Sequence, residues 1–385
     1  MHYDFPTITH INDVLPHIEG RDEFRVIESP EYTTITYAVA LEETFAWDSN
    51  DPIGSAIRRE CRGITFDKDG RIICRPFQKY FNINEKEETQ SNKVNLYEPH
   101  KVLLKYDGSM IKCFSVNDRI VLATKAGETE VSRQALEFIQ DKPGYWTFIK
   151  EMLKFGYTPL FEWVSLKNQI VIPYLEDSLV LLAIRAKYDG DYVDYWRTVG
   201  LAKKHNVPVA QTVENLAKQN IELFVSQVKE WTGQEGIVLR FDNGHMVKCK
   251  SEDYVLRHKT KEQINQEKNV IGVILEDLVD DMIPLLLEAD ADRLKEFQQN
   301  FWNGVNTVEH KLTEMYESGC HYENQKDFAV EFANKLEAQY RPFMFSMRTG
   351  RNPKELLVEA IGKNLSTQTR VDNARWMWNN AKWNI

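Results

Sequence analysis

Turn dipeptides between runs of strand-forming residues recur through the first two thirds of this chain and constrain its fold more than any other feature. Asn and Asp tolerate the positive φ angles of a two-residue hairpin turn, and Gly adopts them freely, so each dipeptide predicts a β-hairpin. The dipeptides are Asp69-Gly70, Asn117-Asp118, Asp189-Gly190 and Asn243-Gly244. Two further strands are expected on either side of Pro30, and helices over residues 131–141 and 212–231. Antiparallel hairpins with interspersed helices indicate an α+β fold, not a doubly wound parallel sheet.

The pattern changes after about Tyr254. Apolar residues there recur near every 3.6 positions and strand signals are few, which predicts an all-α C-terminal domain. Because 385 residues are more than one compact core usually holds, we expect two domains, over residues 1–255 and 256–385. The tryptophan-rich tail is expected to pack a last helix onto the second domain, with base stacking as the alternative.

The composition of the chain argues against several classes of protein. A formal net charge of −10 argues against a protein that coats nucleic acid generally, although it leaves room for a local basic channel. The sequence contains no run of about 18 apolar residues, so we expect no membrane span. The first residues also lack the pattern of a secretory signal. The five cysteines are scattered and lack a C-x-x-C pair, so we expect reduced thiols and no zinc site at Cys320 and His321.

Lys105 ends a predicted strand at the start of the stretch KYDGS. A lysine beside an apolar strand loses hydration, so it needs a carboxylate partner or a lowered pKa. Taken alone, the stretch is better explained by a structural ion pair followed by an ordinary Asp-Gly turn. The charged residues of other strands favour a functional role.

The stretch QEGIVLRFDNGHMVKCK places Glu235 before one strand and Lys248 and Lys250 on the next. Since side chains alternate along a strand, the two lysines point to one face, where a phosphate would relieve their repulsion. Further charged residues lie at or in other strands: Arg62, Lys79 and Glu162. This combination of cations with two carboxylates suits a polyanion such as a nucleoside triphosphate with a metal ion.

These stretches, in this order, resemble the motifs of the covalent nucleotidyltransferases, which are RNA ligases, DNA ligases and capping enzymes. KYDGS resembles the K-x-D-G-S nucleotidyl-transfer motif, and FEWV, EGIV and VKCK resemble the later motifs. ECRGITFD, RPFQKYFN and KCKSEDYV resemble signatures of the bacteriophage T-even type RNA ligases, the RNA ligase 1 family. The resemblance covers most of residues 30–260. Tyr106 in the variable slot and Ile237 in place of the more usual tyrosine are mild departures.

The resemblance implies an ATP-dependent RNA ligase that joins the 5′-phosphate and 3′-hydroxyl ends of single-stranded RNA or cleaved tRNA in RNA repair. It implies three steps: adenylylation of a lysine, transfer of AMP to the RNA 5′-phosphate, and attack by the 3′-hydroxyl. ATP and Mg²⁺ or Mn²⁺ would be the cofactors. Residues 1–255 would be the nucleotidyltransferase domain and residues 256–385 the RNA-specificity domain. The resemblance further implies the cytoplasm of a phage-infected cell and functional pairing with an end-healing kinase/phosphatase.

The resemblance implies that Lys105 is the nucleophile, which must be neutral to attack the α-phosphorus of ATP. We expect Lys248 and Lys250, which would grip the α-phosphate, to lower the pKa of Lys105 together with the metal ion. Glu235 would hold the metal ion or Lys105. The implied catalytic set is Lys105, Lys125, Glu235 and Tyr254.

Other implied roles concern the nucleotide. Tyr37 and Phe81 would line the adenosine, with Lys125 near the adenine or the RNA. Arg62 and Lys79 would contact the nucleotide or its phosphates. The implied nucleotide-binding set is Tyr37, Arg62, Lys79, Phe81, Lys105, Gly108, Glu162, Lys248 and Lys250.

Two carboxylates are the implied metal ligands. Glu162 would bind the ribose or a metal-bound water, and Asp280 matches a family position for a metal ligand. Asp280, beside Asp281, equally fits helix capping. Gly108 would let the backbone approach the nucleotide closely.

Two alternatives remain beside the RNA ligase. A DNA ligase or a GTP-using capping enzyme normally carries a β-barrel domain after the last lysine motif, whereas helical periodicity follows it here. A non-catalytic RNA-binding relative would keep the fold without the chemistry. The intact set of Lys105, Glu235, Lys248 and Lys250 argues against that loss.

Overall fold

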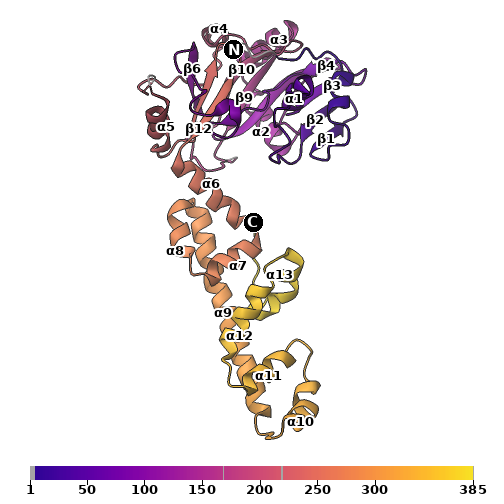
Figure 1. Ribbon diagram of the computed structural model, residues 1–385, viewed down its shortest axis with the longest axis vertical. Coiled ribbons are helices and arrows are strands. Elements are labelled where there is room, and N and C mark those ends of the chain that lie inside the picture. Colours follow the sequence, from indigo (N-terminus) through magenta and orange to yellow (C-terminus); the bar gives the residue numbers. More distant parts are fainter. Residues whose placement is uncertain (1–4, 168, 218–219, 385) are drawn as a thin grey trace. The chain divides into compact units, whose positions relative to one another are not determined.

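The computed structural model describes residues 5–167, 169–217 and 220–384 (Figure 1). The chain divides into two compact units, Met1–Val255 and Leu256–Ile385, and each is described by itself. Mainly antiparallel sheets with helices form the first unit, and helices form the second. The predicted α+β fold with a helical C-terminal region is therefore confirmed.

The sheets of the N-terminal unit have four strands each. The first sheet has the order β1 (Phe24–Glu28), β2 (Tyr32–Tyr37), β3 (Ile64–Asp67), β4 (Ile72–Cys74). The second has the order β10 (Ser178–Ala186), β9 (Tyr157–Val164), β7 (Ser109–Val116), β8 (Arg119–Ala123). The third has the order β5 (Phe81–Asn82), β12 (Met246–Lys250), β11 (Gly236–Phe241), β6 (His100–Lys105). Neighbouring strands are antiparallel except β5 and β12, which run parallel.

Three of the four predicted turn dipeptides connect paired strands, namely β3 to β4, β7 to β8, and β11 to β12. Asn117 and Asp118 have φ angles of 47° and 59°, the left-handed values that a tight hairpin turn requires. The turn at residues 189–190 differs from the prediction. It is followed by a single bridge between Arg185 and Tyr192 and not by a second strand.

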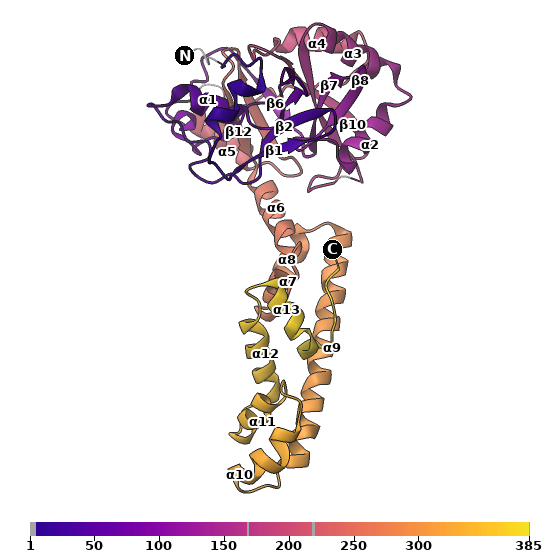
Figure 2. The same ribbon diagram turned by 90° about the vertical axis from the view of Figure 1, so that its right-hand side faces the viewer.

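Helices cover the sheets of this unit (Figure 2). They are α1 (Pro52–Glu60), α2 (Glu130–Ile139), α3 (Pro143–Lys154), α4 (Tyr195–Lys203) and α5 (Ile221–Lys229). The helix expected over residues 212–231 is shorter than predicted because its first residues pair with β6. Thr212 forms a bridge with Leu103, and the Val213 amide donates to the Val102 carbonyl at 2.8 Å. The helix begins only after Asn220, whose side chain accepts from the Leu223 amide at 3.0 Å.

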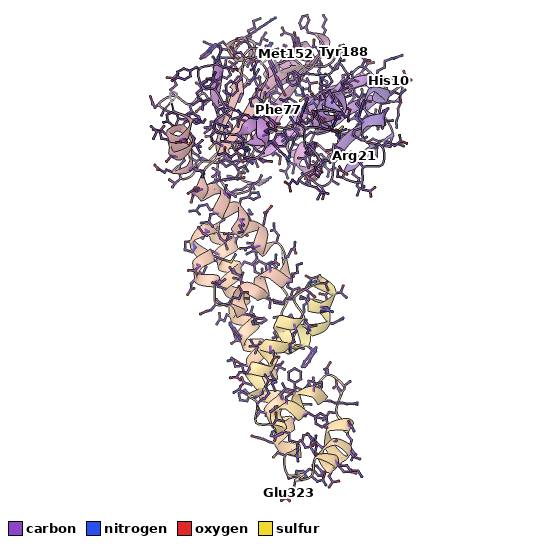
Figure 3. All side chains as sticks on the ribbon, in the orientation of Figure 1. His10, Arg21, Phe77, Met152, Tyr188 and Glu323 are labelled. Atoms are coloured by element: carbon purple, nitrogen blue, oxygen red, sulfur yellow. The ribbon has the colours of Figure 1, made fainter. Side chains whose placement is uncertain are left out.

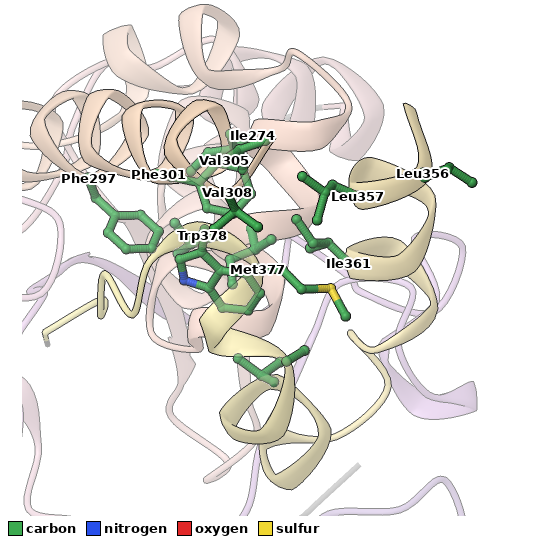
Figure 4. Packing of buried hydrophobic residues seen from close by; sticks show 14 of the residues in the cluster. Ile274, Phe297, Phe301, Val305, Val308, Leu356, Leu357, Ile361, Met377 and Trp378 are labelled. Atoms are coloured by element: carbon green, nitrogen blue, oxygen red, sulfur yellow. The ribbon is translucent and has the colours of Figure 1, made fainter. Parts of the chain in front are cut away.

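Helices build the C-terminal unit around one apolar cluster (Figure 4). They are α6 (Glu252–Ile264), which begins in the first unit, α7 (Glu267–Leu275), α8 (Val279–Met282), α9 (Glu288–Gly319), α10 (Gln325–Asp327), α11 (Arg341–Arg348), α12 (Pro353–Lys363) and α13 (Gln368–Ala374). Trp378 is fully buried against Phe301, with ring centroids 5.7 Å apart. Trp383 donates from its indole to the Ile264 carbonyl at 2.7 Å. The packing interpretation of the tail is thus correct.

Short single turns complete the described chain. The 3₁₀ turns are Ile11–Asp13, Leu15–His17, Glu87–Thr89, Ile283–Leu285, Ala333–Lys335 and Arg375–Trp378, and Phe328–Phe332 is a π-helical turn. Within the described ranges, none of the helices is both long enough and apolar enough to cross a membrane.

Candidate active site

The third sheet brings Lys105, Gly236 and Lys250 into one row across β6, β11 and β12. Gly236 pairs with Lys105 on one side and with Lys250 on the other. Its φ is 138°, and a Cβ there would lie 2.1 Å from the carbonyl oxygen of Cys249, so the position requires glycine. The row therefore has no side chain between its two lysines.

The carboxylate of Glu235 fills the place between the two amines. Nζ of Lys105 lies 2.7 Å from Oε2 of Glu235, and Nζ of Lys250 lies 3.0 Å from Oε1. Glu235 is only 3% exposed. Charge-assisted hydrogen bonds to a buried carboxylate are strong and directional, so Glu235 orients both amines.

The pKa of Lys105 shifts in the direction opposite to the one predicted. Burial lowers it, but the carboxylates of Glu235 and Glu162 together outweigh burial and hold the pKa of Lys105 above its ordinary value. The predicted net lowering is therefore wrong for the ligand-free protein, because Lys248 and Lys250 do not offset the effect of Glu235 on the pKa of Lys105. Lys250 is neutralised by Glu235, and Lys248 has a lowered pKa of its own and carries less charge.

Lys248 and Glu162 are two groups whose charge the protein suppresses. Burial, together with nearby cations such as Arg62, lowers the pKa of Lys248 to about 7. Burial also raises the pKa of Glu162 to about 8, with Glu235 adding to the shift and Lys105 opposing it. Such groups regain their charge when a ligand of opposite charge arrives, which is typical of binding and catalytic sites.

Three more cations surround the phenol of Tyr37: Arg62, Lys79 and Lys125. Nζ of Lys125 lies 4.2 Å from the centre of the Tyr37 ring, and Nζ of Lys79 lies 5.0 Å from it. Burial raises the pKa of Tyr37, but the three cations together lower it more, and the net shift is downward. Among the described residues, no carboxylate lies within 4.0 Å of these three cations. We call them the Tyr37 cation group; their excess of positive charge, which Glu162 offsets only at longer range through Arg62, suits an anion.

Packing in the protein explains why a phenylalanine stands at position 81 and a glycine at position 108. Phe81 is 3% exposed within the apolar cluster of the first sheet, with Nζ of Lys79 5.9 Å from its ring centre. A Cβ at Gly108 would lie 2.2 Å from the carbonyl oxygen of Trp163 in β9. The contacts that the resemblance implies for both residues with a nucleotide stay predictions.

Asp107 has a role that sequence reasoning missed, because Asp-Gly also fits an ordinary turn. Its Oδ2 accepts from the amides of Val171 and Ile172 at 2.7 and 2.8 Å. Its Oδ1 accepts from the hydroxyl of Tyr254 at 2.7 Å. The residue is 2% exposed, so these hydrogen bonds of its buried carboxylate hold the segment that follows Lys105 in place.

Tyr254, predicted as catalytic, stands at the start of α6 beside the two lysine strands. Its ring centre is 4.7 Å from Nζ of Lys250. Burial raises the pKa of Tyr254 well above its ordinary value, and Glu235 and Asp107 add to the shift. The phenol is therefore a hydrogen-bond donor and not an acid at neutral pH. No local pattern could have revealed its bond to Asp107, from which 147 positions separate it.

The predicted metal ligands do not come together within one unit. Glu162 lies on β9, whereas Asp280 lies in the C-terminal unit, in the first turn of α8. Leu278 and not Asp280 is the N-cap of that helix, so capping does not explain Asp280. Over the described ranges, no three His, Cys, Asp or Glu side chains form a metal site by themselves. Mg²⁺ is commonly held by one or two carboxylates with ligand phosphates, and Glu162 beside the cations fits that arrangement.

Comparison with known proteins places these features in a family. Residues 60–264 match the family described as RNA ligase, and residues 261–370 match the family described as T4 RNA ligase 1, C-terminal domain. A candidate RNA ligase of Thermovibrio ammonificans is 24% identical over 367 residues, covering 91% of each chain. RNA ligase 1 of bacteriophage TS2126 is 28% identical over 154 residues, which are 35% of this chain and 36% of that protein. A solved structure of a candidate ATP-dependent DNA ligase from Aquifex aeolicus has a TM-score of 0.43 at 12% identity, covering 96% of this chain and 78% of that one.

Proposed function

Because this chain belongs to the T4 RNA ligase 1 family of RNA ligases, we propose that it joins RNA 5′-phosphate and 3′-hydroxyl ends with ATP as co-substrate. The observation that carries the proposal is the row of Lys105, Gly236 and Lys250, with the Glu235 carboxylate between the two amines. This arrangement orients one amine beside several cations that have no carboxylate partner. It provides a nucleophile and an anion site together.

In the first step, the lone pair of Lys105 Nζ attacks the α-phosphorus of ATP. A nitrogen–phosphorus bond forms, the bond to the β-phosphate oxygen breaks, and pyrophosphate leaves with the electron pair. Lys105 must first release its proton, and the ion pair with Glu235 opposes that release. Binding of the phosphates must therefore be coupled to loosening of this ion pair. The product is lysyl-AMP.

The phosphates of ATP would occupy the space between Lys248, Lys250 and the Tyr37 cation group. Lys248 would regain its full charge there, because a phosphate stabilises the protonated amine. A bound Mg²⁺ or Mn²⁺ would neutralise charge that builds up on the phosphate oxygens, and Glu162 is the side chain best suited to hold it. Since the pKa of Glu162 is about 8, its engagement with a cation would release a proton near neutral pH.

The two later steps use the same positions. AMP passes to the RNA 5′-phosphate, and the 3′-hydroxyl then attacks the activated end and releases AMP. These steps are in-line transfers at phosphorus, which positioning and charge stabilisation serve. We assign reading of the RNA, with cleaved tRNA as the natural substrate, to the helical unit, whose family match supports this division. The same proposal pairs the enzyme with an end-healing kinase/phosphatase.

The test is a ligation assay on a single-stranded RNA with a 5′-phosphate and a 3′-hydroxyl. ATP and Mg²⁺ should give circular or joined RNA, and GTP should give far less. Nicked duplex DNA provides the comparison for a DNA ligase. Sealing of the nicked DNA without joining of the RNA would contradict the proposed substrate.

A further inference from the structure

A cavity of about 50 Å³ lies beside Lys105 and Glu162, between side chains of the second and third sheets. Its polar lining includes Tyr80, Tyr106 and Arg240, in addition to Lys105 and Glu162. The remaining walls are largely apolar side chains, among them Phe77, Leu103, Leu182, Val238 and Met246. Figure 3 labels Phe77 among the side chains of the N-terminal unit. An apolar pocket with a few convergent polar groups is the usual form of a small-molecule site.

Arg240 lines this cavity with a guanidinium that is not fully satisfied. The residue is 7% exposed. Its Nη2 donates to the carbonyl of Val193, and its guanidinium carbon lies 5.1 Å from the centre of the Tyr192 ring. Its Nη1 is buried and has no hydrogen-bond partner among the described residues. Within the same residues, no carboxylate forms an ion pair with it at 4.0 Å or less.

This arrangement is unfavourable for the protein alone. A buried cation without an acidic partner is destabilising, and a buried N–H without an acceptor adds to that penalty. Asp194 and Asp242 act on the Arg240 charge only from beyond ion-pair distance, and the cavity walls nearest to it in the strand pairing, Val238 and Met246, are apolar. The unpaired Nη1 therefore points to an acceptor supplied by a ligand in the cavity.

The position of Arg240 along β11 indicates which part of a ligand it meets. Gly236, Val238 and Arg240 lie on the same face of β11, since side chains alternate along a strand. Gly236 pairs with Lys105, and four residues of antiparallel strand, about 14 Å, separate Gly236 from Arg240. A nucleotide whose α-phosphate is next to Lys105 would lay its base along Val238. The edge of the base farthest from the ribose would face Arg240.

We propose that Nη1 of Arg240 donates a hydrogen bond to the N1 ring nitrogen of the adenine of bound ATP. Arg240 is thereby a specificity-determining residue, and this inference rests on the proposed function. Adenine N1 is an acceptor, whereas guanine carries a hydrogen at N1. The N1–H donor of guanine would face the N–H donor of Arg240, so the site would reject guanine.

The test measures equilibrium binding by calorimetry in the Lys105→Met protein, which cannot form a covalent adduct. The ligands are ATP, 1-deaza-ATP, which lacks the N1 acceptor, and 7-deaza-ATP, which keeps it. We expect 1-deaza-ATP to bind about 10- to 100-fold more weakly than ATP, the range of a charge-assisted hydrogen bond, and 7-deaza-ATP to bind like ATP. When Arg240→Met is added, the affinity for ATP should fall by a similar factor, and the affinity for 1-deaza-ATP should fall no further.

Two further variants control the experiment. Arg25→Met removes the same charge from an exposed strand position and should leave all three affinities unchanged. Arg240→Gln keeps an N–H donor without the charge. The factor by which 1-deaza-ATP binds more weakly than ATP should therefore be smaller in this variant than with Arg240 and larger than in Arg240→Met. If Arg240→Met does not fold, Arg240→Gln tests the proposed hydrogen bond in its place.

Equal binding of ATP and 1-deaza-ATP when Arg240 is present would overturn the inference. The same is true of a 1-deaza penalty that survives undiminished in Arg240→Met or Arg240→Gln. If the Lys105→Met protein fails to bind ATP and the unmodified protein fails to join RNA, the proposed function fails instead.

Discussion

Nζ of Lys105 lies 2.7 Å from Oε2 of Glu235, although 130 positions separate the two residues in the chain. The pair joins the proposed nucleophile to a nearly buried carboxylate, and the pKa of Lys105 rises as a result. The ligand-free enzyme thus keeps its amine protonated and oriented. Adenylylation then depends on how the ion pair responds to bound nucleotide and to pH.

Replacing Glu235 by Gln removes a carboxylate that raises the pKa of Lys105. The pKa of Lys105 should fall, so the pH profile of adenylylation should move to lower pH. The maximal rate should also fall about 10- to 100-fold, because the charge-assisted bond that orients the amine is lost. Rates of protein labelling by α-labelled ATP across pH test this, with Glu222→Gln at an exposed position as the control. A profile that moves to higher pH would contradict the role of Glu235.

Replacing Lys250 by Ala leaves Glu235 with Lys105 as its remaining close cation in the row. Glu235 should then hold the proton on Lys105 more strongly, and the adenylylation profile should shift to higher pH. The rate near pH 7 should fall at least 10- to 100-fold, since a phosphate contact is lost as well, and raising the pH should restore part of it. A large rate loss with an unchanged profile would leave Lys250 as a phosphate contact only.

Replacing Tyr254 by Phe removes the hydroxyl that donates to the buried Oδ1 of Asp107. An unpaired buried acceptor costs about 1–3 kcal/mol, so the N-terminal unit should melt at a lower temperature. Asp107→Asn in the same background should cost less than it does alone, since the two residues share one bond. Scanning calorimetry measures both effects, and Tyr97→Phe, at a residue 79% exposed, is the matched control. Additive effects of the two substitutions would disprove the coupling.

Lys112 makes stability depend on pH. Its amine is fully buried and donates to the Gly63 carbonyl and the Thr65 hydroxyl at 2.5 and 2.7 Å, which fixes the chain next to Arg62. Burial lowers the pKa of Lys112 to about 8, against about 10.4 in an unfolded chain. Between these values the unfolded state binds more protons, so this lysine's contribution to stability rises with pH by up to about 3 kcal/mol.

The difference in free energy of unfolding between the unmodified protein and Lys112→Met should therefore move in favour of the unmodified protein from pH 7.5 to pH 10. Denaturation at the two pH values measures it. A difference that is independent of pH would mean that Lys112 keeps its ordinary pKa in the folded protein.

Local patterns in the sequence predicted the local parts of this structure well. Asn117 and Asp118 carry the positive φ angles that their turn requires. Lys248 and Lys250 alternate with the buried Cys249 on β12, as strand periodicity predicts, and so point to one face. Such features depend on neighbours within a few positions.

Features set by distant partners were predicted less well. The expected helix over residues 212–231 loses its first half because Thr212 and Val213 pair with β6 instead. The direction in which the pKa of Lys105 shifts depends on how close Glu235 and Glu162 come to Lys105, which the spacing of these residues in the sequence does not reveal. The orphaned Nη1 of Arg240 is likewise visible only once the strands are paired.

Lys105 should form a covalent bond to AMP. Mass spectrometry of peptides from protein incubated with ATP and Mg²⁺ tests it most directly. We expect an AMP adduct on the peptide that contains Lys105, labile in acid as a phosphoramidate, and no adduct on the Lys105→Met protein. That variant should still seal RNA supplied with a pre-adenylylated 5′ end. AMP attached to a different residue, or an adduct that persists in Lys105→Met, would show that Lys105 is not the nucleophile.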